Sequence, residues 1–264
     1  MKSYYFGLIL VFQFFSTLPI PIEVEMNKEN IERSIRLFPF LGLFFGLVYA
    51  STAFILHSYS SLSNLLITFV IWLLGIVLTG GIHLDGWMDT SDAFFSYRNP
   101  EQKLEIMADP RIGAFGVIGA IVLLMAKFIF IYEVLVNSSS FTFILILFIP
   151  FLSRSLMGFF LTAIPNAKHE GLGQLFQSAK GPRTILFYLL YFLIIIFSLY
   201  LINSQLLLAF IVLWISSIFY FFFIKKKTVQ WFGGTTGDVI GAATEGVELL
   251  LWLVLLILQS FDMV

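Results

Sequence analysis

The stretch TGGIHLDGWMDTSDAFFSYRNPEQKLEIMADPRIGAFG, residues Thr79–Gly116, lies between two long apolar runs. Six of the sixteen acidic residues in the chain fall between Asp85 and Asp109. A helix needs about 20 apolar residues to cross a bilayer, and the runs on either side approach or exceed that length. This polar island between apolar runs predicts helices that lie in lipid, with the chemistry where the chain leaves the membrane.

The amino-acid composition also indicates that most of the chain lies in lipid. The chain has 264 residues, of which 59% are hydrophobic and 12% are charged. Soluble domains carry about 25% charged residues, so there is too little polar surface here to cover a water-soluble globule. The net charge of −1 argues against a nucleic-acid partner, which would require a basic face. The absence of cysteine excludes disulfides, thiolate catalysis and cysteine-ligated metals.

The apolar segments predict an all-α, polytopic integral membrane bundle of seven or eight transmembrane segments, forming one catalytic domain over residues 1–264. The first segment is short and ends at Pro19 and Pro21, so it either spans or tilts into the interface. It has no small-residue cleavage site and is interpreted as a retained segment rather than a signal peptide. The candidate spans are Tyr4–Leu18, Ile35–Leu56, Leu62–Gly80, Ile112–Val136, Phe141–Ile164, Thr184–Ile202, Leu206–Ile224 and Val247–Phe261.

The connections between these segments are of two alternating kinds. Three of them, 57–63, 137–140 and 203–205, are short and carry no lysine or arginine. By the positive-inside rule the other side is cytoplasmic, which predicts a multi-pass protein of the cell membrane with its active face in the cytoplasm. Twelve of the fifteen basic residues lie on that other side: Lys28, Arg33, Arg36, Arg98, Lys103, Arg111, Lys168, Lys180, Arg183, Lys225, Lys226 and Lys227.

The acidic cluster has helical spacing. Asp85, Asp89 and Asp92 stand at i, i+4 and i+7, and therefore share one face of a helix. Glu105 and Asp109 form a second pair with i, i+4 spacing. Two helices presenting such faces would suit Mg²⁺, which is held by carboxylates together with water and substrate phosphates. The alternative is a solvated amphipathic loop, which suits this cluster poorly because paired lysines are lacking.

His83 precedes this cluster and admits two interpretations. It could act as an acid, a base or a ligand, or it could form only a local hydrogen bond at a helix start. We include it among the candidate substrate-binding residues.

Other polar islands lie on the same side. The segment FGGTTGDVIGAATE, 232–245, offers Gly233, Gly234, Thr236 and Asp238, whose backbone amides and side chains could cradle phosphate. The segment 164–176 adds Glu170 before a Gly-x-Gly turn.

Two basic residues, Lys127 and Arg154, lie inside predicted spans. A basic residue at the membrane centre costs about 2.5–3.5 kcal/mol on insertion scales and therefore normally faces a polar cavity. Because the predicted site is acidic and holds a metal, we expect a bound phosphate to be their partner, together with Arg111.

These motifs resemble the cobalamin synthase family, also called the adenosylcobinamide-GDP ribazoletransferases. The resemblance rests on ordered blocks that span Gln13 to Glu245. Two positions depart from the usual pattern: Leu18 stands where arginine is common, and Pro110 where serine is common. The blocks are QFFSTLPIP, FPFLG, TGGIHLDGWMDTSDA, KLEIMADPRIGAFG, the Ser153–Arg154 pair, HEGLGQLF and FGGTTGDVIGAATE.

The resemblance implies an Mg²⁺-dependent enzyme of a late step in cobalamin synthesis. Its substrates would be adenosylcobinamide-GDP and α-ribazole or α-ribazole 5′-phosphate, and GMP would leave. Asp85, Asp89, Asp92, Glu105 and Asp109 would hold the metal, and Asp109 is the candidate general base. The lipid bilayer is an expected partner, and the sequence leaves a homo-oligomer open.

Two other functions share single features with this sequence. A CDP-alcohol phosphotransferase-like membrane enzyme also uses aspartates around metal and pyrophosphate, but its D-x-x-D-G-x-x-A-R signature is incomplete here. A transporter would place its charges near the membrane centre, often on repeated segments. The acidic residues cluster in loops instead, which disfavours transport.

Overall fold

The computed structural model describes residues 2–167, 172–179, 181 and 183–263. Within those ranges every regular element of secondary structure is an α-helix, and the one β-type contact is an isolated bridge between Asn166 and Thr235. The predicted all-α class is therefore confirmed. In chain order the helices are α1 (Lys2–Phe15), α2 (Lys28–Arg36), α3 (Phe38–Tyr59), α4 (Asn64–Thr79), α5 (Ile82–Phe95), α6 (Pro100–Met107), α7 (Ala114–Val136), α8 (Ser140–Ala163), α9 (Leu172–Ser178), α10 (Arg183–Ile202), α11 (Ser204–Phe232) and α12 (Gly237–Ser260).

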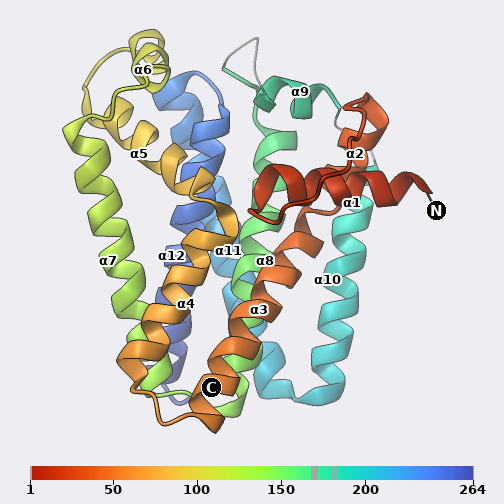
Figure 1. The fold of residues 1–264 in the computed structure, drawn as a ribbon, viewed down its shortest axis with the longest axis vertical. Coiled ribbons are helices and arrows are strands. Elements are labelled where there is room, and N and C mark those ends of the chain that lie inside the picture. The colour runs from red at the N-terminus through yellow and green to blue at the C-terminus, as the bar shows by residue number, and fades with distance from the viewer. Residues whose placement is uncertain (1, 168–171, 180, 182, 264) are drawn as a thin grey trace.

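Six of the described helices, α3, α7, α8, α10, α11 and α12, are long and apolar enough to cross a membrane. The pair α4 and α5 gives a seventh span, and these two helices are bent by 86° at the break between them. Gly80 and Gly81 form this break with φ angles of 64° and 75°, which glycine adopts without steric cost. Helix α4 therefore runs along the bundle and α5 crosses over its end (Figure 1).

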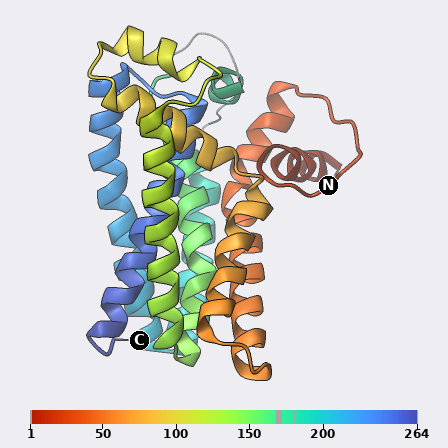
Figure 2. The same cartoon turned by 60° about the vertical axis from the view of Figure 1, so that its left-hand side comes forward.

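The first candidate span, Tyr4–Leu18, for which both spanning the membrane and tilting into the interface were open, is not among the spanning helices of the described residues. Its apolar helix covers only Tyr4–Phe15, which is too short to cross a membrane. Figure 2 shows α1 and α2 beside the bundle, with α1 viewed end-on and therefore crossing the direction of the long helices. The prolines that follow prevent the helix from continuing.

The two ends of the bundle differ. At one end lie the short turns after α3, α7 and α10 and the chain terminus after α12 (Figure 1). At the other end, hereafter the polar end, lie α2, α5, α6, α9 and the start of α12. The alternation of connections predicted from the basic residues is thus reproduced in space. The multiple apolar helices make this a multi-pass membrane protein.

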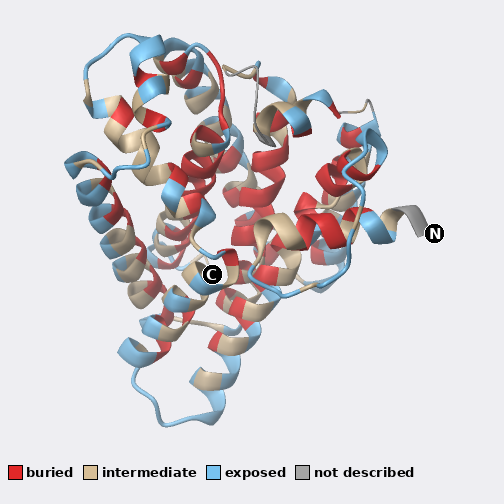
Figure 3. Ribbon diagram, turned by 45° about the horizontal axis from the view of Figure 1, so that its top comes forward, coloured by how far each residue is buried: buried red, intermediate tan, exposed pale blue. Residues whose placement is uncertain are grey.

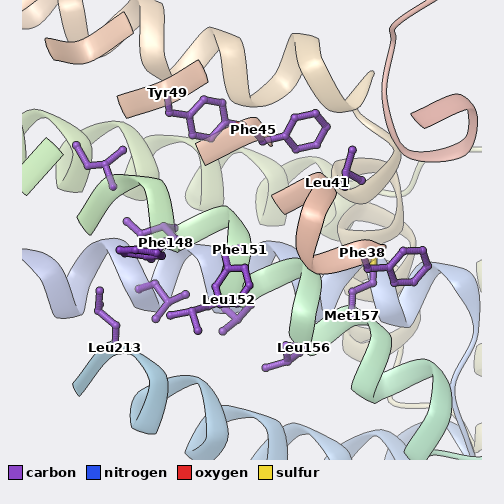
Figure 4. Packing of buried hydrophobic residues seen from close by; sticks show 14 of the residues in the cluster. Phe38, Leu41, Phe45, Tyr49, Phe148, Phe151, Leu152, Leu156, Met157 and Leu213 are labelled. Atoms are coloured by element: carbon purple, nitrogen blue, oxygen red, sulfur yellow. The ribbon is translucent and has the colours of Figure 1, made fainter. Parts of the chain in front are cut away.

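Helix α8 forms the centre of the bundle, and buried residues line the inner faces of the helices around it (Figure 3). It packs closely on α3 because two glycines of α3 allow the backbones to meet. A Cβ at Gly42 would lie 2.4 Å from the Pro150 carbonyl oxygen, and one at Gly46 would lie 1.9 Å from that of Leu147. Small residues at such crossings are typical of helices packed in membranes. Phe38, Phe45, Phe151 and neighbouring side chains fill the remaining space (Figure 4).

Candidate active site

Helix α5 carries the three aspartates that the sequence placed on one helical face. Asp85 is exposed, whereas Asp89 and Asp92 are half-buried. The helix starts at the glycine break, and Asp85 lies in its first turn. A negative charge there is stabilised by the positive end of the helix dipole. The predicted helical spacing is confirmed, but the three carboxylates do not have the same surroundings.

Asp92 joins α5 to α7. One of its carboxylate oxygens accepts a hydrogen bond from the backbone N–H of Gly113 at 2.8 Å, and the other accepts one from Gly116 at 2.8 Å. A Cβ at Gly113 would lie 2.2 Å from an Asp92 oxygen, so glycine is needed for this approach. Both oxygens therefore serve the start of α7, a position where a carboxylate satisfies unpaired N–H groups. This geometry gives Asp92 a structural role and not the metal-binding role expected from the sequence.

The backbone of α5 also packs directly against the backbone at the start of α12. A Cβ at Gly86 would lie 2.6 Å from the carbonyl oxygen of Asp238, and one at Gly241 would lie 3.2 Å from the Cα of His83. This backbone contact brings the part of α5 that holds Asp85 and Asp89 next to Asp238. Sequence reasoning named both segments but did not show that they meet.

The second predicted pair of carboxylates does not share a helical face. Glu105 is exposed on α6, whereas Asp109 follows the C-cap residue Ala108 and lies beyond the helix. Arg111 donates to Asp109 from its backbone N–H at 3.0 Å, from Nε at 2.9 Å and from a terminal nitrogen at 2.6 Å. The helix stops because Pro110 disfavours a helical residue before it.

The bonds from Arg111 lower the pKa of Asp109 to about 2. A carboxylate with so low a pKa is a weak base at neutral pH, so the structure gives no support to Asp109 as the general base. The side chain of Arg111 is 87% exposed and is paired with Asp109. It does not line the cavity at the polar end.

The glycine-rich segment after α11 forms a contact between chain segments. Gly233 ends α11 with φ 72°. A Cβ at Gly234 would lie 2.6 Å from the Pro165 carbonyl oxygen. Next to it the Thr235 N–H donates to that same oxygen at 2.8 Å, and the Ala167 N–H donates to the Thr235 carbonyl at 2.7 Å. The close approach that we expected for a ligand is thus made by residues 165–167. Glu170 lies outside the described residues.

The two basic residues inside the spans have carboxylate partners, which corrects the expectation that they face a phosphate. Lys127 on α7 is paired with Glu245 and Glu248 on α12, the latter at 3.0 Å. Arg154 on α8 is 1% exposed and is paired with Glu248. Paired charges reduce the cost of burial in lipid. Sequence reasoning did not pair Lys127 and Arg154 with Glu245 and Glu248, although the i, i+3 spacing of these two glutamates inside an apolar segment was a visible signal.

A cavity of about 330 Å³ opens at the polar end, beneath the start of α5. It brings together three residues that were predicted to bind substrate: His83, Thr236 and Asp238. Thr236 also caps α12 by accepting a hydrogen bond from the Val239 N–H at 3.2 Å. The ring of His83 stacks on Phe15 of α1, with centroids 6.2 Å apart and an interplanar angle of 19°. Helix α1 therefore forms a wall of this cavity instead of a span.

The donor set at the polar end fits a metal that shares its ligands with a substrate. In the part of the chain that the structure describes, no three His, Asp or Glu side chains are already grouped to hold an ion. Mg²⁺ is commonly held by one or two carboxylates together with substrate phosphates, not by a cage of protein ligands. Asp85 and Asp89 lie one turn apart on α5, the helix whose first residues, Ile82 and His83, line the cavity, and they provide that number of carboxylates. Asp92 caps the start of α7, and Asp109 is bonded to Arg111.

Comparison with known proteins places the chain in a family. The family model described as cobalamin-5-phosphate synthase matches residues 7–256. A protein of Geobacillus sp. (strain WCH70), named adenosylcobinamide-GDP ribazoletransferase, is 36% identical over 264 residues, covering 100% of both chains. A protein of the same name from Geobacillus thermodenitrificans (strain NG80-2) is 32% identical over the same full length. One from Treponema denticola is 38% identical over 185 residues, which are 69% of this chain and 67% of that protein.

No solved structure matches the chain. The family match covers α3 to α11 completely and includes the cavity, the α5 aspartates and the buried ion pairs. The curated relatives are enzymes of one named activity over their whole length. The chain therefore belongs to the cobalamin-5-phosphate synthase family, and it is a membrane-embedded transferase of late cobalamin biosynthesis.

Proposed function

We propose that the enzyme transfers the adenosylcobinamide-phosphate group of adenosylcobinamide-GDP to the 5′-hydroxyl of α-ribazole or α-ribazole 5′-phosphate, with Mg²⁺ required and GMP released. The hydroxyl oxygen bonds to the phosphorus that carries cobinamide, the bond to the GMP oxygen breaks, and the hydroxyl proton passes to a carboxylate. The observation that supports this proposal is the cavity at the polar end, which is lined by Asp238 and by the first residues of α5, the helix that carries Asp85 and Asp89.

Phosphoryl-type transfer depends mainly on positioning and on neutralising charge. Asp85 and Asp89 would hold Mg²⁺, which would supply positive charge to the pyrophosphate oxygens. The close contact of Gly86 with Asp238 fixes α5 relative to α12 and so fixes the two aspartates relative to the cavity. Asp92 supports this arrangement by anchoring α5 to α7. The buried pairs of Lys127 and Arg154 hold α7, α8 and α12 together below the cavity.

We assign the polar end to the cytoplasmic side of the cell membrane. Basic residues concentrate in the connections at that end, as the positive-inside rule requires. The chain contains no cysteine, so labelling of a single introduced cysteine shows on which side of the membrane that residue lies. An impermeant maleimide added to whole cells should label Ser61→Cys, and should label Tyr97→Cys only after the cells are opened. The reverse pattern would overturn the assignment.

Turnover of the purified protein tests the reaction itself. The enzyme in lipid nanodiscs would receive adenosylcobinamide-GDP and α-ribazole, with Mg²⁺ or with EDTA, and both GMP and the cobalamin product would be quantified. Equal amounts of the two products with Mg²⁺, and none with EDTA, are expected. Product formed from a CDP-linked alcohol, with none from adenosylcobinamide-GDP, would contradict the proposal and favour the CDP-alcohol reaction.

A further inference from the structure

The cavity at the polar end has a composition that selects one part of one substrate. We infer that it binds the benzimidazole base of the ribazole acceptor, with the Nε2–H of His83 donating a hydrogen bond to the free ring nitrogen of that base. This inference rests on the proposed function, because the function supplies the acceptor. It goes further by assigning the acceptor subsite and the residue that recognises its base.

The walls of the cavity suit a flat, largely apolar ring. Apolar side chains from helices α1, α3, α8, α9 and α12 converge there, and some of their aromatic rings contact one another edge to face. The Phe15 ring lies 5.1 Å from that of Phe38 and 5.8 Å from that of Phe176. Aromatic rings in such arrangements form a preferred surface for another aromatic ring. The apolar lining includes Phe14, Phe15, Phe38, Met157, Phe176 and Ile240.

His83 brings a buried ring nitrogen to the wall of this apolar space. The residue is 3% exposed and lines the cavity. Its Nε2 is buried and makes no hydrogen bond with any of the residues described in the structure. A buried polar atom without a partner costs free energy, so a ligand that supplies one acceptor would recover it. Dimethylbenzimidazole, once joined to ribose, has one free ring nitrogen and no other polar ring atom.

The end of the cavity next to α12 is more polar than its walls. Asp238 and Thr236 lie there, at the start of α12, and both line the cavity. With the base among the phenylalanines, the ribose would lie toward these residues, and its hydroxyls could donate to the Asp238 carboxylate. The neighbouring stretch of α5 carries Asp85 and Asp89. The 5′-hydroxyl would then point toward the proposed position of the pyrophosphate.

Guanine, the other base in the reaction, fits this lining less well. It presents a carbonyl, an amino group and several ring nitrogens, each of which loses energy when buried without a partner. The cavity volume of about 330 Å³ is at the small end of the range for ligand pockets, about 300–1,000 Å³, which suits a single nucleoside. The GMP half of the donor is therefore placed outside the cavity.

A probe that lacks the recognised atom tests this inference. The α-riboside of dimethylindole has the shape of α-ribazole with C–H in place of the free ring nitrogen. Binding of both ribosides to the wild-type protein, His83→Phe and Ile82→Trp would be measured by equilibrium dialysis, alongside KM for each substrate. Ile82 is 44% exposed at the cavity and can be enlarged with little risk to folding. His57→Phe, at the opposite end of the bundle where His57 bonds to Ser138, is the matched control.

The wild-type protein and the control should bind α-ribazole about tenfold more tightly than the indole analogue. His83→Phe should bind both ribosides equally weakly, and Ile82→Trp should weaken both, while KM for adenosylcobinamide-GDP stays within twofold in each variant. A His83→Phe enzyme that still prefers α-ribazole tenfold would overturn the subsite even if turnover is normal. Absence of GMP release from the wild-type enzyme would overturn the proposed function as well.

Discussion

Lys127 on α7 donates a hydrogen bond to Glu248 on α12 at 3.0 Å, inside the apolar part of the bundle. Glu248 is also paired with Arg154 of α8, so one carboxylate links three helices. With Glu245 included, the network has two positive and two negative side chains and is neutral overall. Buried charges are tolerated when they balance in this way, and removing one of them leaves another unpaired.

The Lys127→Met variant is therefore expected to lose stability. The unpaired carboxylates should lower the free energy of unfolding by about 3–5 kcal/mol, which is the usual cost of breaking a buried ion pair. Thermal unfolding in one detergent at fixed concentration measures the change. The double variant Lys127→Met/Glu245→Gln restores neutrality and should recover part of the loss. A single variant as stable as the wild type would show that these charges are not coupled.

Asp92 should matter for stability more than Asp85 does. Asp92→Ala removes the carboxylate that caps α7, at an expected cost of about 0.5–2 kcal/mol. Asp85→Ala removes an exposed side chain and should leave the thermal midpoint nearly unchanged. Equal midpoints for the two variants would contradict the structural role assigned to Asp92.

The contact between α5 and α12 requires glycine at position 86. A Cβ in Gly86→Ala would lie 2.6 Å from the Asp238 carbonyl oxygen, so the helices must separate. We expect a loss of about 1–3 kcal/mol from overpacking, and a fall in kcat because Asp85 and Asp89 move with the helix. Gly237→Ala is the stability control, since a Cβ there meets no atom within 4 Å. A Gly86→Ala enzyme with wild-type stability and kcat would refute this contact.

Because the pKa of Asp109 is low, we expect its titration to have no effect on the dependence of the reaction rate on pH near neutrality. With a pKa of about 2 the carboxylate stays ionised through the neutral and mildly acidic range. Its bond to Arg111 stabilises the fold above the ordinary pKa of about 3.9 and is lost only as the pH falls through the lowered value. Asp109→Asn should therefore keep the acidic limb of the rate profile between about pH 5 and pH 8. Disappearance of that limb would restore Asp109 as the base.

Much of this architecture follows from the sequence because apolar segments in lipid have few alternatives to helix. The spans other than Tyr4–Leu18, the alternation of connections with and without basic residues and the helical spacing of Asp85, Asp89 and Asp92 were predictable. Hydrophobicity and charge along the chain determine these features locally. The same reasoning placed Glu105 and Asp109 on one helix, and that was wrong because α6 stops at Met107.

The partners of polar side chains could not be predicted, because they depend on which helices meet. Lys127 and Arg154 were correctly judged to need partners, but the choice between a phosphate and a carboxylate requires the position of Glu248. The cavity depends in the same way on α1, whose Phe15 stacks on His83 across 68 residues of sequence. Such long-range contacts leave no periodic pattern in a single sequence.

In the proposed reaction Asp85 and Asp89, and not Asp92, would hold Mg²⁺. The most direct measurement is a metal titration of Asp85→Asn, Asp89→Asn and Asp92→Asn, with turnover followed against Mg²⁺ and bound Mn²⁺ followed by electron paramagnetic resonance in the presence of adenosylcobinamide-GDP. The first two variants should need about tenfold more metal or more, because even indirect changes at metal sites cost about 10–100-fold in affinity. Asp92→Asn should stay within about twofold of the wild type. Unchanged metal affinity in Asp85→Asn and Asp89→Asn would contradict the account.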